Sequence, residues 1–120
     1  MDCKILVIED RKEDRDILKR CLNEAGYNNI IEAESGESGI EKAQLEKPSL
    51  IILDTIMPGI DGFETCKQIK AIEGLKTKII ICTSSIDAVD AHRARAMGCD
   101  DYCVKANDNE SLIEAVKKFI

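Results

Sequence analysis

Short runs of consecutive apolar residues alternate along the chain with longer segments whose apolar residues recur every three or four positions. The short runs predict five strands, at residues 5–8, 30–31, 50–53, 79–82 and 102–104. In the first, third and fourth runs the apolar residues do not alternate with polar ones. Both faces of these strands are therefore expected to be covered, which is typical of a parallel sheet wrapped by helices.

Five helices are predicted between and after the strands, from segments with a helical spacing of apolar residues. The segments 36–46, 63–73 and 87–98 carry thin apolar stripes, whereas the first and last helices have broad apolar faces. Gly26 offers a stop for the first helix, and Asp108 offers a cap for the last. Five strand–helix units in succession predict one doubly wound α/β domain over residues 1–120. The broad faces consist of Ile17, Leu18, Cys21, Leu22 and Ala25 in the first helix, and of Leu112, Ile113, Val116, Phe119 and Ile120 in the last.

The composition narrows the class of protein. Aromatic residues make up only 3% of the chain, so the core must be built from aliphatic side chains and cysteine. The formal net charge is -6 and no basic stretch interrupts the acidic average, which argues against direct contact with nucleic acid. The first residues lack the features of a signal peptide, and no apolar segment approaches the roughly 20 residues that span a bilayer. We therefore expect a soluble, cytoplasmic protein without membrane contact.

The six cysteines form no recognisable metal or disulfide motif. None is spaced as C-x-x-C, and His92 is the only histidine, so a zinc site is not favoured. Most of them lie in apolar runs or stripes, where a reduced thiol acts as a small hydrophobic side chain. In a reducing compartment we expect these residues to be mainly core filler: Cys3, Cys21, Cys66, Cys82, Cys99 and Cys103.

Side chains that can carry chemistry stand at the ends of four predicted strands. Because the carboxyl ends of parallel strands meet at one edge of a sheet, we expect these side chains to share a pocket. The set would bring together three carboxylates, a hydroxyl and an ammonium group. Its members are Glu9 and Asp10 after the first strand, Asp54 after the third, Thr83 at the end of the fourth and Lys105 after the fifth.

Three carboxylates in one pocket repel one another, and without a compensating cation at least one of them would hold a proton. Oxygen ligands with no nearby histidine or cysteine favour Mg²⁺. The ammonium group of Lys105 and the hydroxyl of Thr83 would then contact a phosphoryl group. The chain contains neither G-x-x-x-x-G-K-[ST] nor G-x-G-x-x-G, so the phosphoryl donor must be carried by another molecule. This pattern predicts a phosphoryl-accepting site with Asp54 as the nucleophile.

Each of these residues also has an ordinary structural explanation. The acids could be favoured by a helix dipole or a turn, Thr83 could be a plain strand residue and Lys105 a surface lysine. The corresponding alternative is a pure binding module whose acids have no chemical role. The coincidence of all these side chains at matching strand ends favours the chemical interpretation.

Four motifs carry a resemblance to a known family, and together they cover essentially the whole chain. They are ILVIED at 5–10, LIILDTIMPGIDGFE at 50–64, IIICTSS at 79–85 and GCDDYCVK at 98–105. In order and spacing they resemble the receiver domain of two-component response regulators, in particular its small standalone type. The resemblance implies a flavodoxin-like fold with the strand order 2-1-3-4-5.

The resemblance also implies an activity. Asp54 would accept a phosphoryl group from a sensor histidine kinase, a phosphotransfer protein or a small phosphodonor. Glu9 and Asp10 would bind Mg²⁺, with Asp10 as the direct ligand, and Asp54 and the backbone carbonyl of Ile56 would complete the protein ligands. Such a protein catalyses only its own phosphorylation and dephosphorylation, so we do not expect an enzyme that acts on external substrates.

The same resemblance assigns a switch. Thr83 and Lys105 would bind the phosphoryl group, and the movement of Thr83 toward it would let Tyr102 turn inward. The surface formed by the fourth helix, the fifth strand and the fifth helix would then contact a downstream protein target. A homodimer through this same surface is a further option.

One departure from the family pattern bears on these expectations. The family follows its lysine with a proline in a cis bond, whereas this chain has Ala106. A non-proline cis bond costs about 3 kcal/mol, which favours a trans bond and a re-aimed Lys105.

Phosphatases of the haloacid-dehalogenase type are the alternative enzyme, because they also use an aspartate nucleophile and Mg²⁺. They need a second aspartate two residues later, where this chain has Ile56.

Overall fold

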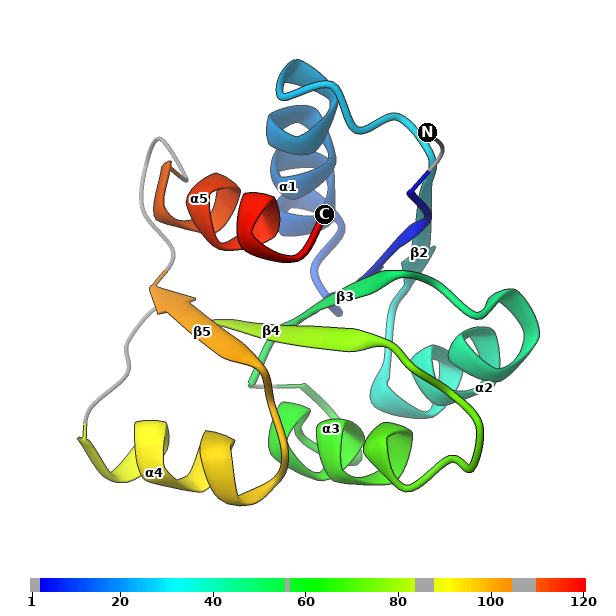
Figure 1. Ribbon diagram of the computed structural model, residues 1–120, viewed down its shortest axis with the longest axis vertical. Coiled ribbons are helices and arrows are strands. Elements are labelled where there is room, and N and C mark those ends of the chain that lie inside the picture. Colours follow the sequence, from blue (N-terminus) through cyan, green and yellow to red (C-terminus); the bar gives the residue numbers. More distant parts are fainter. Residues whose placement is uncertain (1–2, 56, 84–87, 105–109) are drawn as a thin grey trace.

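The computed structural model describes residues 3–55, 57–83, 88–104 and 110–120, in which strands and helices alternate strictly (Figure 1). The strands are β1 (Ile5–Ile8), β2 (Ile30–Ala33), β3 (Leu50–Leu53), β4 (Lys78–Thr83) and β5 (Asp101–Val104). The helices are α1 (Lys12–Glu24), α2 (Gly36–Glu46), α3 (Gly62–Lys70), α4 (Ala88–Ala96) and α5 (Glu110–Phe119).

The five strands form one sheet in the order β2-β1-β3-β4-β5, and every neighbouring pair is parallel. The predicted α/β fold class and the strand order implied by the resemblance are thus confirmed. The central pair is in register, so that Ile8 at the end of β1 lies beside Leu53 at the end of β3. The loops that follow these two strands therefore start at the same edge of the sheet.

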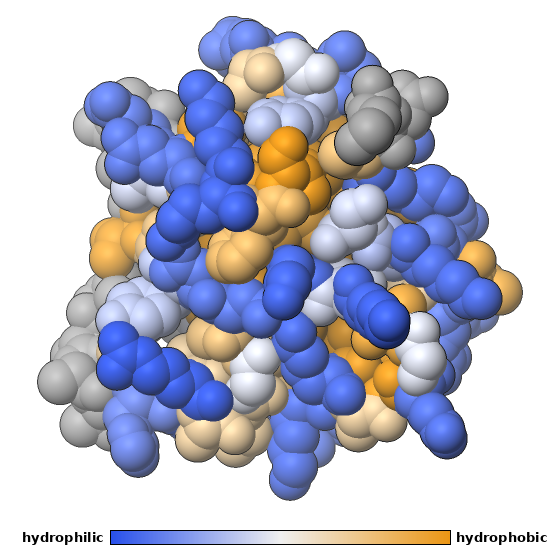
Figure 2. All heavy atoms as spheres, in the orientation of Figure 1, coloured by the Kyte–Doolittle hydropathy of each residue, from blue (hydrophilic) through white to orange (hydrophobic). Residues whose placement is uncertain are grey.

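Helices cover both faces of the sheet, with α1 and α5 on one side and α2, α3 and α4 on the other (Figure 1). All four residues of β1 and of β3 are buried, as expected for strands covered on both faces. The edge strand β2 buries only Ala33 fully. The face of the molecule seen in Figure 2 carries many hydrophilic side chains, with apolar areas between them. Among the described residues, no helix combines the length and the apolar character needed to cross a bilayer.

Cysteine contributes to the core as predicted. Cys66, Cys82 and Cys103 are buried, the other cysteines are partly buried, and all six are free thiols. Burial raises the pKa of the Cys66 thiol to about 12, so this side chain stays neutral and acts as an apolar group. The prediction of cysteine as a small hydrophobic residue therefore holds best for these three buried positions.

The prediction that Ile17 belongs to the buried face of the first helix is wrong. Ile17 is 47% exposed, whereas Leu18 and Leu22 are 4% and 0% exposed. Successive helical residues are rotated by about 100°, so a face centred on Leu18 and Leu22 leaves the preceding residue at its margin. The apolar face of α1 is therefore narrower than the sequence pattern indicated.

The third helix is also shorter than the predicted segment 63–73. It ends at Lys70, and Ile72 then donates its N–H to the Ile69 carbonyl over 3.1 Å, a contact three residues back along the chain. Such a contact tightens the last turn, and Gly74 follows with a φ of 81°. The tightened turn ends the regular helix at Lys70, and a glycine in this conformation keeps the chain from resuming a right-handed helix after it.

The close contact between α2 and β1 generates a prediction about stability. A Cβ atom at Gly39 would lie 2.4 Å from Cδ1 and 2.8 Å from Cγ1 of the buried Ile8. Alanine is the better helix former, by about 1 kcal/mol, but overpacking a core costs about 1–3 kcal/mol, and contacts this short with a fully buried side chain place the cost in the upper half of that range. We expect Gly39→Ala to lower the free energy of unfolding by about 1–2 kcal/mol in urea denaturation. The exposed Glu41→Ala in the same helix should change it by less than about 0.5 kcal/mol, and equal stabilities would refute the prediction.

Candidate functional site

Three carboxylates converge at the carboxyl edge of the sheet. Glu9, Asp10 and Asp54 each present an oxygen, and these atoms lie within 4.8 Å of one another. Glu9 is buried, whereas Asp10 and Asp54 are partly exposed. The parallel register places Ile8 and Leu53 side by side, so the acids that follow them enter the same space. The structure therefore brings together all three predicted acids.

Backbone hydrogen bonds extend the sheet into both acidic loops. The Asp54 N–H donates to the Ile8 carbonyl over 3.1 Å, and the Glu9 N–H donates to the Ala33 carbonyl over 3.0 Å. The Glu9 carboxylate also accepts from the Arg11 N–H, with 3.2 Å between Oε1 and N. The first and third acids are thus fixed to rigid strands and not to free loop tips.

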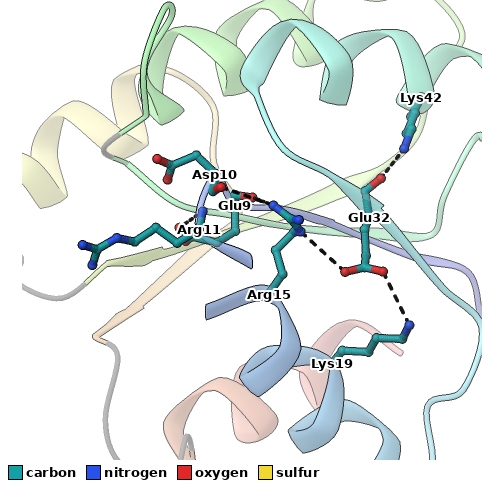
Figure 3. A network of polar contacts seen from close by, with 7 residues as sticks. All are labelled: Glu9, Asp10, Arg11, Arg15, Lys19, Glu32 and Lys42. Carbon is teal, nitrogen blue, oxygen red and sulfur yellow. Dashed lines mark hydrogen bonds and ion pairs between the residues drawn. The ribbon is translucent and has the colours of Figure 1, made fainter. Parts of the chain in front are cut away.

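Arg15 of α1 holds the loop that carries Glu9 and Asp10 (Figure 3). Its Nη1 donates to the backbone carbonyls of these two residues, over 2.8 Å and 3.3 Å. Its Nε lies 3.5 Å from Oε1 of Glu32, which also contacts Lys19. The Arg15 side chain is only 13% exposed, so these contacts are partly shielded from water. The sequence analysis missed Arg15, because nothing in its spacing shows which carbonyls it reaches.

Gly62 closes the loop on the other side of Asp54. The Gly62 N–H donates to the Thr55 carbonyl over 3.0 Å, and a Cβ atom at this glycine would lie only 2.0 Å from the Asp54 carbonyl oxygen. The next helix can therefore begin this close to Asp54 only with glycine at its first position. Asp61 caps the same helix by accepting the Glu64 N–H over 2.9 Å. The Pro- and Gly-containing segment after β3 thus holds the backbone of the acidic residue in place.

Thr83 lies at the end of β4 and is 3% exposed. The hydroxyl of Thr55 donates to its hydroxyl oxygen, with 2.9 Å between the two Oγ1 atoms. Thr55 was not among the predicted site residues. The sequence does not give the β3–β4 register, in which Leu53 pairs with Ile81 and the residues two further along fall side by side.

Tyr102 lies in β5, paired with Ile81 of β4, and packs against the small apolar cluster of Phe63, Ile81 and Ala94. The ring is partly buried, and its hydroxyl accepts from Arg95 Nη2 over 3.2 Å. The same guanidinium lies 5.6 Å from the centre of the ring. The aromatic residue is therefore held between the sheet and α4.

Several predicted features lie outside the described residues. These are Lys105 and its bond to Ala106, the backbone carbonyl of Ile56 and the helix cap Asp108. Their roles stay predictions. The position of Lys105 in the chain, directly after β5, agrees with the strand end expected for it.

The donor set fits a hard divalent cation. Glu9, Asp10 and Asp54 offer carboxylate oxygens only, which suits Mg²⁺ better than a soft metal. Ligand oxygens on one Mg²⁺ lie roughly 3–4 Å apart, given bond lengths of about 2.0–2.1 Å. The mutual spacing of these oxygens, within 4.8 Å, needs little adjustment to meet that geometry.

The doubly wound parallel sheet, with three carboxylates gathered at its carboxyl edge, defines an α/β protein of the flavodoxin-like class. The chain belongs to the response regulator receiver domain family, whose model matches residues 5–117. It is 37% identical over 120 residues to the alkaline phosphatase synthesis transcriptional regulatory protein PhoP of Bacillus subtilis, covering all of this chain and 49% of that protein. It is 30% identical over 114 residues to protein PilH of Pseudomonas aeruginosa, covering 94% of this chain and 93% of that protein.

Solved structures show the same fold. The chemotaxis protein CheY4 of Vibrio cholerae superposes with a TM-score of 0.86 at 26% identity, over all of both chains. The response regulator TrrA of Thermotoga maritima, solved in complex with Mg²⁺ and BeF, superposes with a TM-score of 0.87 at 35% identity, over 98% of both chains. The chain spans about half the length of several curated relatives, including PhoP. These comparisons support two-component phosphorelay signalling, and they do not support the alternative phosphatase of the haloacid-dehalogenase type.

The contacts of Arg15 can be tested with a substitution that leaves the charge of the site unchanged. Arg15→Lys retains the positive charge but loses the planar fork that reaches two carbonyls. Losing one hydrogen bond of about 1 kcal/mol should weaken Mg²⁺ binding about fivefold, measured by titration of amide NMR shifts. Lys19→Arg is the control, because Lys19 also contacts Glu32, and no bond drawn in Figure 3 joins it to the carbonyls of Glu9 and Asp10. Unchanged Mg²⁺ affinity in Arg15→Lys would show that only the charge of Arg15 matters.

Proposed function

We propose that residues 1–120 form a phosphoryl-accepting receiver domain in which Asp54 is the acceptor. The observation that carries this proposal is the convergence of Glu9, Asp10 and Asp54 within 4.8 Å, with Asp54 open to solvent on one side. A buried acid could not be reached by a phosphodonor, whereas a fully exposed one would not gain from its neighbours. The membership of the chain in the receiver domain family supports the same assignment.

Mg²⁺ is the proposed cofactor, held by Glu9, Asp10 and Asp54 and by the backbone carbonyl of Ile56. Asp10 is its proposed direct ligand. When bound, it neutralises the acids and the incoming phosphoryl oxygens. The complex of TrrA with Mg²⁺ and BeF supports this choice of metal, because that protein is 35% identical to this chain.

The proposed reaction is a transfer of one phosphoryl group. A carboxylate oxygen of Asp54 forms a bond to phosphorus while the bond from phosphorus to the histidine nitrogen of the donor breaks. The imidazole leaves with the electron pair of that bond and takes up a proton from water. With acetyl phosphate the leaving group is acetate. Thr83 and Lys105 would donate hydrogen bonds to the transferred group and stabilise its charge.

The proposed partners are a sensor histidine kinase or phosphotransfer protein as donor and a protein as the downstream target. The receiving surface for the target is the face formed by α4, β5 and α5, and a homodimer through this face is the competing arrangement. On this face β5 exposes Val104, and a groove of about 620 Å³ lies between β5 and α5, lined by residues such as Asp101, Glu114 and Lys118. A mixed apolar and charged groove of this kind suits a regulated protein contact. The cytoplasm is the proposed compartment, and no external substrate is turned over.

Phosphorylation can be tested by mass spectrometry of the intact protein. Incubation with Mg²⁺ and acetyl phosphate should add one phosphoryl group to the native chain, and none to Asp54→Asn or when EDTA removes the cation. The control is Asp16→Asn, because Asp16 is an exposed acid of α1 outside the converging set. This variant should be phosphorylated like the native chain. A phosphoryl group on Asp54→Asn would contradict the assigned acceptor.

Turnover of an external phosphoester distinguishes the receiver from the phosphatase. We expect no more inorganic phosphate from an alkyl phosphomonoester such as glycerol phosphate with the native chain and Mg²⁺ than with Asp54→Asn. The reason is that residue 56 is isoleucine and cannot protonate a leaving group. Multiple turnovers that disappear in Asp54→Asn would support an enzyme with external substrates.

A further inference from the structure

We propose that Thr55 is a positioning residue that holds Thr83 in its resting place. Thr83 would then exchange a hydrogen bond with Thr55 for one with the phosphoryl group on Asp54. This inference rests on the proposed function of Asp54 and Thr83, and it adds a residue to the switch that the sequence analysis did not include.

The contact itself is short and shielded. The two hydroxyl oxygens lie 2.9 Å apart, and Thr55 and Thr83 are 8% and 3% exposed. In a buried site water cannot readily replace a lost partner, so a hydrogen bond there favours the arrangement that makes it. The contact therefore biases Thr83 toward the position seen in this structure.

Thr55 is the fixed member of the pair. Its carbonyl accepts the Gly62 N–H over 3.0 Å, and a Cβ atom at Gly62 would lie 2.8 Å from the Thr55 Cα, so the start of α3 packs directly on it. The preceding residue is tied to β1 by the bond from the Asp54 N–H to the Ile8 carbonyl, which is 3.1 Å long. Because the backbone of Thr55 is fixed, a movement of Thr83 would break this hydrogen bond without any shift of the Thr55 backbone.

The two contacts of Thr83 make different demands on its side chain. Thr55 lies beside Thr83, two residues beyond the paired Leu53 and Ile81, whereas the phosphoryl group would stand on the preceding residue, Asp54. The hydroxyl oxygens of the two threonines are 2.9 Å apart, so movement of the Thr83 hydroxyl toward a group on Asp54 would lengthen this contact beyond hydrogen-bonding distance. Phosphorylation would therefore break the contact between the two threonines.

A contact that exists in only one of two states shifts their equilibrium by its own free energy. A net neutral hydrogen bond corresponds to about fivefold in an equilibrium constant. Replacing Thr55 by valine keeps the branched shape and exchanges the hydroxyl for a methyl group. This change should destabilise the resting position of Thr83 without touching the acids, so it should make the activated state easier to reach.

The test is a titration with beryllofluoride and Mg²⁺, a phosphoryl analogue on Asp54, followed by NMR of the Tyr102 ring and the threonine methyl groups. We expect Thr55→Val to bind beryllofluoride about fivefold more tightly than the native chain. Thr55→Ser retains the hydroxyl and should restore the native affinity. The control is Thr77→Val, because the buried Thr77 donates to the Pro48 carbonyl over 2.6 Å next to the opposite end of β4. This variant should lose thermal stability and keep the native affinity.

Each outcome decides between explanations. Equal affinity in the native chain, Thr55→Val and Thr55→Ser would overturn the proposal and leave Thr55 with a purely structural role. Weaker binding by Thr55→Val would also overturn it, because Thr55 would then assist Thr83 in the activated state. Asp54→Asn distinguishes a failure of the proposed function from a failure of the role proposed for Thr55. Undiminished binding by Asp54→Asn would refute the proposed function itself, whereas its loss together with unchanged Thr55→Val would refute only the role of Thr55.

Discussion

Repulsion between three carboxylates at one edge of the sheet is the constraint on which the rest of this structure depends. Their oxygens lie within 4.8 Å of one another, and Glu9 is buried. Like charges at such distances near a protein surface cost on the order of a few kcal/mol per pair. Gathering these acids costs the fold stability, which agrees with the cation site proposed for them.

The fold meets this cost by making the surrounding backbone rigid. The two central strands that lead to the acids are buried along their whole length, and their parallel pairing fixes the distance between the two acidic loops. Arg15 then holds the first loop by its carbonyls, and Gly62 lets α3 begin against the carbonyl of Asp54. These contacts of Arg15 and Gly62 act on backbone atoms and not on the carboxylates. The acids are therefore preorganised, so that binding need not order the loops as well.

The features that follow from short-range patterns were predictable, and those that depend on strand register were not. Consecutive apolar residues indicated the buried strands, and the acids at their ends followed from the geometry of any parallel sheet. The burial of Ile17 was predicted wrongly because a helical pattern shows that a helix has an apolar face. It does not show how much of that face the neighbouring sheet covers. Arg15 and Thr55 were missed for a related reason, since their partners are defined only once helix, strand and loop are packed together. Longer side chains and exact pairings thus mark the limit of inference from the sequence.

The two ends of the site differ in how firmly they are held, and this difference suits a switch. The acidic end is tied by backbone hydrogen bonds from β1, β2 and α3, which a ligand would not break. At the other end, Thr83 and Tyr102 lie on the same face of neighbouring strands, because Thr83 is two residues beyond the partner of Tyr102. Both are held there by side-chain contacts, Thr83 by Thr55 and Tyr102 by Arg95 on α4. Side-chain contacts of this kind can be exchanged at low cost while the sheet stays intact. In the proposed switch, a rigid acceptor next to two exchangeable side chains would let a charge placed on Asp54 alter the surface at α4 without disturbing the core.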